Sequence, residues 1–188
     1  YNETKQRSDK YGRMVETAPL TPKDAWTFYH AIYVPSVGYP LQNCHFTRTK
    51  LEDMFRRGMS AMFAKCGFNR NTQRTIVFAP FRYGGCGFLS LYLLQGEGQI
   101  LQFLKHWRTD TLVGKTLRVA VSWVQLHLGT SWFFLTDTTT PLPHFPGCWL
   151  QSLRTFLSRI KGSIEVDTYF LPPIQRTNDV YIMDLILH

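Results

Sequence analysis

The fold is decided most clearly by residues 49–67, which read TKLEDMFRRGMSAMFAKCG. The first four residues, from Thr49 to Glu52, match the capping box of a helix N-terminus. Gly67 can end the helix in a left-handed conformation. The stretch therefore predicts an amphipathic helix with one buried face, because apolar side chains cover about half of its circumference: Leu51, Met54, Phe55, Met59, Met62, Phe63 and Cys66.

Upstream, a second capping box, Thr21-Pro22-Lys23-Asp24, predicts a helix over about 22–34. The helix should end before Pro35, because the residue before a proline disfavours helical geometry. Two prolines and a glycine within residues 35–40 indicate a rigid turn. Residues 1–18 are polar and weakly periodic, so we expect a polar extension there.

Downstream, three longer segments predict helices over about 89–107, 111–128 and 148–161. The second is apolar almost all round, which predicts a central position in a bundle. A last short helix runs to Leu187, with Asn178 or Asp179 as its cap. Residues 75–78 and 163–167 have the pattern of short extended segments.

These elements predict a mainly α fold, a helical bundle of about five helices with short extended segments. We expect a single helical domain over 19–188, preceded by the polar extension of 1–18. The glycines of Tyr83-Gly84-Gly85-Cys86-Gly87 indicate a turn with positive φ or very close packing.

Charge is large and unevenly distributed. The 188 residues carry 21 Lys and Arg against 13 Asp and Glu, a net charge of +8. Residues 48–82 alone carry +6, whereas residues 163–188 carry −3. This distribution favours a polyanionic partner, such as nucleic acid, that meets the middle of the chain.

No apolar run is long enough to span a bilayer, and the first residues lack an initiator Met and an apolar signal core. We therefore expect a piece of a longer intracellular protein, nuclear or cytoplasmic, that is not secreted and has no membrane partner. The spacing of the cysteines indicates free thiols and no zinc site, for Cys44, Cys66, Cys86 and Cys148.

Catalytic motifs are absent from the sequence. No Gly-x-Ser-x-Gly elbow occurs, Gly114-Lys115-Thr116 has only the end of a phosphate-binding loop, and the histidines are scattered. We therefore predict no catalytic residue, no metal ligand and no cofactor in this chain. The one candidate for a two-metal nuclease site is a set of carboxylates, Glu165, Asp167, Asp179 and Asp184.

Several segments, read together, resemble one family. They are residues 29–41 (YHAIYVPSVGYPL), 65–71 (KCGFNRN), 83–88 (YGGCGF), 95–96 (QG) and 106–108 (HWR). In order and spacing they resemble the region downstream of the palm in reverse transcriptases of LINE-like (non-LTR) retroelements. The resemblance covers about residues 22–188.

The resemblance implies a mainly helical thumb and connector that grips the primer–template duplex. Such enzymes carry adjacent aspartates in the palm, and this sequence has no such pair. The chain is thus expected to lack catalytic activity alone, with Mg²⁺ bound in the parent polymerase. The resemblance places a structural turn at Gly84 and Gly85 and a nucleic-acid contact at Asn69, Arg70 and Asn71.

Our first hypothesis is a non-catalytic C-terminal fragment of an RNA-directed DNA polymerase that contacts the backbone of an RNA–DNA or DNA duplex. Its contact residues are basic or amide side chains: Arg48, Lys50, Arg56, Arg57, Arg70, Arg74, Arg82, Gln95, Gln99, Gln102, Lys105 and Arg108.

Two other readings remain open. Aromatic residues lie between the cations, and either stacking on unpaired bases or core packing explains them: Phe68, Phe81, Tyr83 and Trp107. The alternative function is a helical interaction module that completes a missing palm domain without touching nucleic acid. That module would expose an apolar patch and self-associate in isolation.

Overall fold

The computed structural model describes residues 1–69 and 71–187 and is mainly helical, as predicted. None of the described residues forms a β-strand, and there are more helical segments than the expected five. The chain divides into two compact units, Tyr1–Glu97 and Gly98–His188. Each unit has its own apolar core. This partition differs from the expected boundary between a polar extension and one domain at residue 18.

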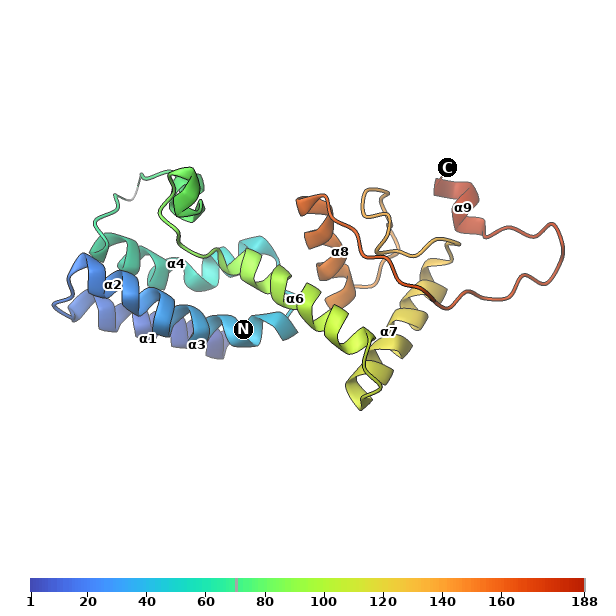
Figure 1. Ribbon diagram of the computed structural model, residues 1–188, viewed down its shortest axis with the longest axis horizontal. Coiled ribbons are helices and arrows are strands. Elements are labelled where there is room, and N and C mark those ends of the chain that lie inside the picture. Colours follow the sequence, from blue (N-terminus) through green and yellow to red (C-terminus); the bar gives the residue numbers. More distant parts are fainter. Residues whose placement is uncertain (70, 188) are drawn as a thin grey trace. The chain divides into compact units, whose positions relative to one another are not determined.

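Residues 1–18 are not an extension in the structure. They contain helix α1 (Asn2–Thr17), which packs along α4 (Arg48–Lys65) in the first unit (Figure 1). The buried residues of α1 are Ser8, Gly12 and Val15, spaced at i, i+4 and i+7. Because two of these three are small and not apolar, the pattern of α1 resembles that of a solvated segment.

The segment after α1 forms a nearly continuous helical rod. The capping box of Thr21 and Asp24 is confirmed at the start of α2 (Pro22–Phe28). The rod continues through a π-helical turn (Tyr29–Tyr33), α3 (Val34–Gly38) and a 3₁₀ turn (Tyr39–Asn43).

The predictions of a helix end before Pro35 and of a rigid turn over 35–40 are therefore wrong. Proline lacks an N–H and disturbs the bonding of the preceding turn. Here that turn is widened, and the N–H of Val34 bonds to the carbonyl of Tyr29, five residues back. A π-turn of this kind accommodates Pro35 at the start of α3.

Helix α4 confirms the amphipathic prediction for residues 49–66 but begins earlier. Its N-cap is Thr47 and not the predicted Thr49. The Thr47 hydroxyl accepts a hydrogen bond from the N–H of Lys50. Gly67 is left-handed with φ of 84°, as expected for the residue that ends this helix. Residues 75–78, expected to be extended, instead lie in the short helix α5 (Arg74–Phe78).

The glycine-rich turn after the 3₁₀ turn η3 (Phe81–Tyr83) has the predicted geometry. Gly84 and Gly87 have φ of 77° and 68°. A Cβ on Gly85 would lie 2.0 Å from the carbonyl oxygen of Ala79. The following Phe88 is buried, and its ring contacts those of Tyr29, His30, Phe63 and Phe68.

Helix α6 (Leu91–Trp107) contains the boundary between the two units. The second unit contains α7 (Leu112–Leu128), α8 (Trp149–Ile160) and α9 (Ile182–Leu187). Thr111 caps α7, and Gly129 ends it with φ of 63°. Residues 163–167, expected to be extended, do not form a strand, and Ile164 donates one backbone hydrogen bond to Leu135.

The predicted central position of α7 is wrong. Its buried side contains Gly114, Val121, Val124, Gln125 and Leu128. The opposite side exposes large apolar residues, which are Leu112, Val113, Val119, Trp123 and Leu126. Among the described residues, no helix is both long and apolar enough to cross a membrane.

Candidate nucleic-acid interface

Four of the five basic side chains of α4 are exposed, and the fifth, Lys65, is half-buried and donates to the carbonyl of Ala18. Arg48, Lys50, Arg56 and Arg57 are all exposed; the last three lie away from the buried face that packs in the core, whereas Arg48 is the first residue of the helix. This arrangement confirms the two-sided pattern expected for residues 49–66. It places Lys50, Arg56 and Arg57 on the exposed side of one helix.

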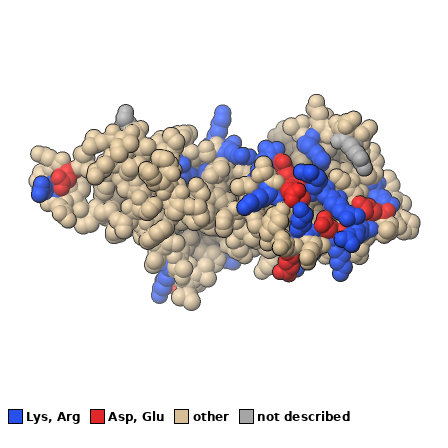
Figure 2. Space-filling model, turned by 180° about the vertical axis from the view of Figure 1, so that it is seen from behind, with Lys and Arg blue, Asp and Glu red and all other residues tan. Residues whose placement is uncertain are grey.

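Acidic residues lie among these cations. Arg48 donates to Glu52 at 2.8 Å, and Arg57 reaches Glu16 of α1 at 3.3 Å. Figure 2 shows Lys and Arg gathered over the first unit, with Asp and Glu between them. Exposed ion pairs of this kind contribute about 0.2–1 kcal/mol and are screened by salt. A phosphate can therefore compete for Arg48 and Arg57 at small cost.

A third acidic residue, Asp53, is held more firmly. Its carboxylate accepts hydrogen bonds of 2.9 Å from the Lys5 ammonium and from the Tyr1 hydroxyl. These two bonds, that from Lys5 first, lower the pKa of Asp53. The contact joins the start of α1 to α4, and Asp53 is the last carboxylate before a long stretch without any.

Residues 54–96 contain no Asp or Glu. In this stretch Arg56, Arg74 and Arg82 are exposed and form no ion pair with a described residue. The guanidinium of Arg74 lies 5.0 Å from the ring centre of Phe63, and that of Arg82 lies 4.6 Å from that of Tyr83. The charge excess of the first unit is therefore concentrated in α4, α5 and η3.

Two of the three glutamines of α6 are buried and do not belong to an exposed surface. Gln95 is 1% exposed and donates to the carbonyl of Phe46 at 3.0 Å. Gln99 is fully buried and donates to the Ser152 hydroxyl at 3.2 Å. Each of these two side chains forms a hydrogen bond inside its own unit. Gln102 is half-buried. The polar stripe predicted on residues 89–107 is thus largely internal.

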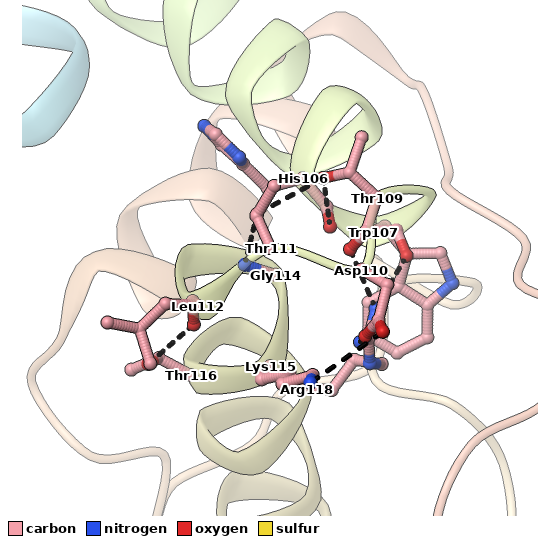
Figure 3. Close-up of polar contacts among 10 residues, drawn as sticks. All are labelled: His106, Trp107, Thr109, Asp110, Thr111, Leu112, Gly114, Lys115, Thr116 and Arg118. Carbon is pink, nitrogen blue, oxygen red and sulfur yellow. Dashed lines mark hydrogen bonds and ion pairs between the residues drawn. The ribbon is translucent and has the colours of Figure 1, made fainter.

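Lys105 and Arg108 are exposed in the second unit, at the end of α6 and just after it. In the neighbouring turn, Lys115 and Arg118 both form ion pairs with Asp110 (Figure 3). Arg118 also donates to the carbonyls of Trp107 and Thr109. Lys115 and Arg118 therefore hold the α6–α7 turn.

Of the loop that carries the family resemblance, Arg70 lies outside the described residues. Asn69 accepts the N–H of Asn71 through its side-chain oxygen at 3.1 Å, which forms a local turn. The proposed contact at Asn69, Arg70 and Asn71 stays a prediction.

The four aromatic residues among the cations divide into two pairs. Phe68 and Trp107 pack against the two cores. Phe81 is 64% exposed and Tyr83 is 70% exposed, so core packing does not account for their positions. Phe81 also lines a shallow pocket together with Trp26. This pocket could not be found from the sequence, because no local pattern connects two residues so far apart.

None of the four cysteines, all of which are described, forms a disulfide, and each is only partly buried. Burial raises the pKa of the Cys44 and Cys66 thiols. Among the described residues, no group of three or more His, Cys, Asp or Glu side chains is placed to hold a metal ion. Two of the candidate nuclease carboxylates have local roles, since Asp179 accepts the N–H of Arg176 and Asp184 that of Ser131.

Comparisons with protein-family models, with curated proteins and with solved structures found no match to this chain.

Proposed function

We propose that the chain is a non-catalytic part of an RNA-directed DNA polymerase, a reverse transcriptase, that grips the backbone of the primer–template duplex. The observation that carries the proposal is the acid-free stretch of residues 54–96, with its exposed cations on α4, α5 and η3. Cations without a carboxylate partner are available to neutralise phosphates and release counterions.

The proposed contact set is smaller than the sequence suggested. It consists of Lys50, Arg56, Arg74 and Arg82, with Arg48 and Arg57 joining when phosphate replaces Glu52 and Glu16. Lys105 and Arg108 form a separate basic site of the second unit. Contacts of this type position a duplex without reading its sequence.

The remainder of the parent polymerase is the second partner. The chemistry of nucleotide addition would come from Mg²⁺ held by paired palm aspartates of the parent. The described residues of this chain have no carboxylate group suited to that ion. Its proposed contribution is therefore binding and orientation of the duplex.

Charge reversal on α4 tests this proposal. The double variant Arg56→Glu with Arg57→Glu should weaken binding of a short blunt duplex at least ~10-fold in a fluorescence anisotropy titration. The matched control is Lys161→Glu with Arg176→Glu, which changes the net charge equally on the second unit. Equal loss of affinity in both double variants would show a nonspecific charge effect and contradict the proposal.

A second candidate function is favoured by one observation, the exposed apolar side of α7. Val119, Trp123 and Leu126 are spaced at i, i+4 and i+7 on that side, and Trp123 is 56% exposed. An apolar helix face of this kind marks a protein contact. In this alternative, the face packs against the rest of the parent polymerase and the positive charge has no direct partner.

The alternative predicts self-association of the isolated chain, measured by sedimentation equilibrium. Changing Val119→Gln and Trp123→Gln should then shift the chain to monomer without a change in duplex affinity. Thr155→Gln, at an exposed position of α8 in the same unit, serves as the control. A wild-type chain that stays monomeric at high concentration would argue against this function.

A further inference from the structure

A shallow pocket of about 450 Å³ opens on the surface of the first unit. Its wall consists of three aromatic rings and two small residues, namely Trp26, Phe68, Phe81, Gly85 and Cys86. The centres of the Trp26 and Phe81 rings are 6.1 Å apart. Aromatic walls of this size are suited to a flat, mostly apolar ligand.

The glycine-rich turn builds this pocket. A Cβ on Gly87 would lie 2.5 Å from Cε2 of Phe81, and a Cβ on Gly85 would collide with Ala79. The absence of a side chain at Gly87 therefore lets the Phe81 ring lie close over the turn, and its absence at Gly85 lets the turn pack against Ala79. Backbone bonds from Gly87 to Ala79 and from Cys86 to Ile76 tie the turn to α5. Phe81 is thus exposed by a fixed local structure.

The charge beside the pocket is positive. Arg82 and Tyr83 follow Phe81 on the same 3₁₀ turn, and the Arg82 guanidinium lies over the Tyr83 ring. Arg74 is exposed on α5, which precedes that turn by two residues. Exposed aromatic rings next to arginines are the combination that binds single-stranded nucleic acid, because bases stack while cations meet phosphates.

We propose that this pocket receives an unpaired nucleobase of a single-stranded tail next to the gripped duplex, with the base stacked on Phe81. Arg82 and Arg74 neutralise the flanking phosphates. Stacking on an aromatic ring accepts every base, so the site has little sequence preference. The inference rests on the proposed function, since it extends the same basic surface.

The test compares two fluorescent probes, a short blunt duplex and the same duplex with a single-stranded tail. Wild-type chain should bind the tailed probe ~10-fold more tightly, the effect expected for one stacked base. Phe81→Ala should remove this preference and leave the affinity for the blunt duplex unchanged. Tyr39→Ala, which removes another exposed ring of the first unit, should keep the preference.

The outcomes separate the two proposals. Binding of the blunt duplex together with an equal tail preference in wild type and Phe81→Ala overturns the pocket and leaves the backbone grip standing. No binding of the blunt duplex, with a tail bound through Phe81, overturns the grip and leaves the pocket standing.

A second measurement tests the pocket on the wild-type chain and does not depend on the folding of Phe81→Ala. A tailed probe with 5-iodouracil in its single strand is irradiated on wild-type chain, and the crosslinked peptide is identified. Crosslinks to Trp26, Phe68 or Phe81 support the pocket. Crosslinks confined to other peptides, or none at all, overturn it.

Discussion

Two glycines allow the helices of the first unit to meet at one point. A Cβ on Gly12 of α1 would lie 3.2 Å from the Cα of Gly58 on α4. Beside them, the buried hydroxyls of Ser8 and Tyr33 share a hydrogen bond of 2.8 Å. Burial raises the pKa of Tyr33, so its hydroxyl stays protonated for this contact. Small residues therefore allow the close contact between α1 and α4, the helix that carries the basic surface.

We predict that Gly58→Ala destabilises the chain by about 1–3 kcal/mol, the usual cost of overpacking. The new Cβ would lie 2.6 Å from the Tyr33 hydroxyl and 2.8 Å from that of Ser8. Gly147→Ala is the matched control, since nothing lies within 4 Å of its Cβ position. Urea denaturation measures the unfolding midpoints of both variants. Equal midpoints would contradict close packing between α1 and α4 at Gly58.

Single residues also show where sequence reasoning fails. Helical periodicity identified the buried face of α4, because apolar side chains report burial directly. It misplaced Gln95 and Gln99, because a buried amide with a partner has the same pattern as a solvated one. The Gly12–Gly58 contact joins two helices distant in sequence, and neither helix carries a local signal for it.

At the scale of elements, a loop before α8 is held by side chains and not by a regular structure. Arg154 of α8 is half-buried and donates to the carbonyls of Phe134, Asp137 and Thr140. The Asp137 carboxylate accepts bonds from the hydroxyls and N–H groups of Thr139 and Thr140. Helical periodicity alone would put Arg154 on the exposed side of α8, because a cation that binds backbone carbonyls has no distinct sequence pattern.

The loop predicts a pH dependence of stability. The bond from the Thr140 hydroxyl, followed by those from Thr139, holds the pKa of Asp137 well below its ordinary value near 4. A lowered folded-state pKa gives stability that is complete above about pH 5 and lost as the pH falls below about 4.

Asp137→Asn should therefore be less stable by about 1 kcal/mol at neutral pH and have a flatter acid limb. Thermal unfolding between pH 7 and pH 2 measures both effects. Asp167→Asn, an exposed carboxylate of the same unit, should follow wild type. If the stability of Asp137→Asn fell with pH as steeply as that of wild type, the Asp137 loop would not be the cause of the acid destabilisation.

The helical segments were predictable in proportion to how well they obey local rules. The apolar periodicity of α4 and α8 gave bounds within one or two residues. The rod from α2 to α3 departed from prediction because a π-turn absorbs Pro35. The outward apolar side of α7 depends on which neighbours cover a helix, and hydrophobicity alone contains no such information.

For the molecule as a whole, charge position is more informative than total charge. The net charge of +8 suggested a polyanionic partner. The structure adds that carboxylates pair with Arg48 and Arg57, whereas Arg56, Arg74 and Arg82 form no ion pair with a described residue. Sequence reasoning could find the basic segment, but the pairing of Arg57 with Glu16 depends on the packing of α1 against α4.

The salt dependence of duplex binding shows whether the exposed cations of α4, α5 and η3 neutralise phosphates. Affinity for a blunt duplex is measured over a range of salt concentrations for wild type and for Arg56→Glu with Arg57→Glu. We expect a steep linear loss of log affinity with log salt for wild type, and a shallower slope for the double variant because fewer phosphates are neutralised. A wild-type affinity that does not respond to salt, or identical slopes for both proteins, would contradict a basic surface that grips the backbone.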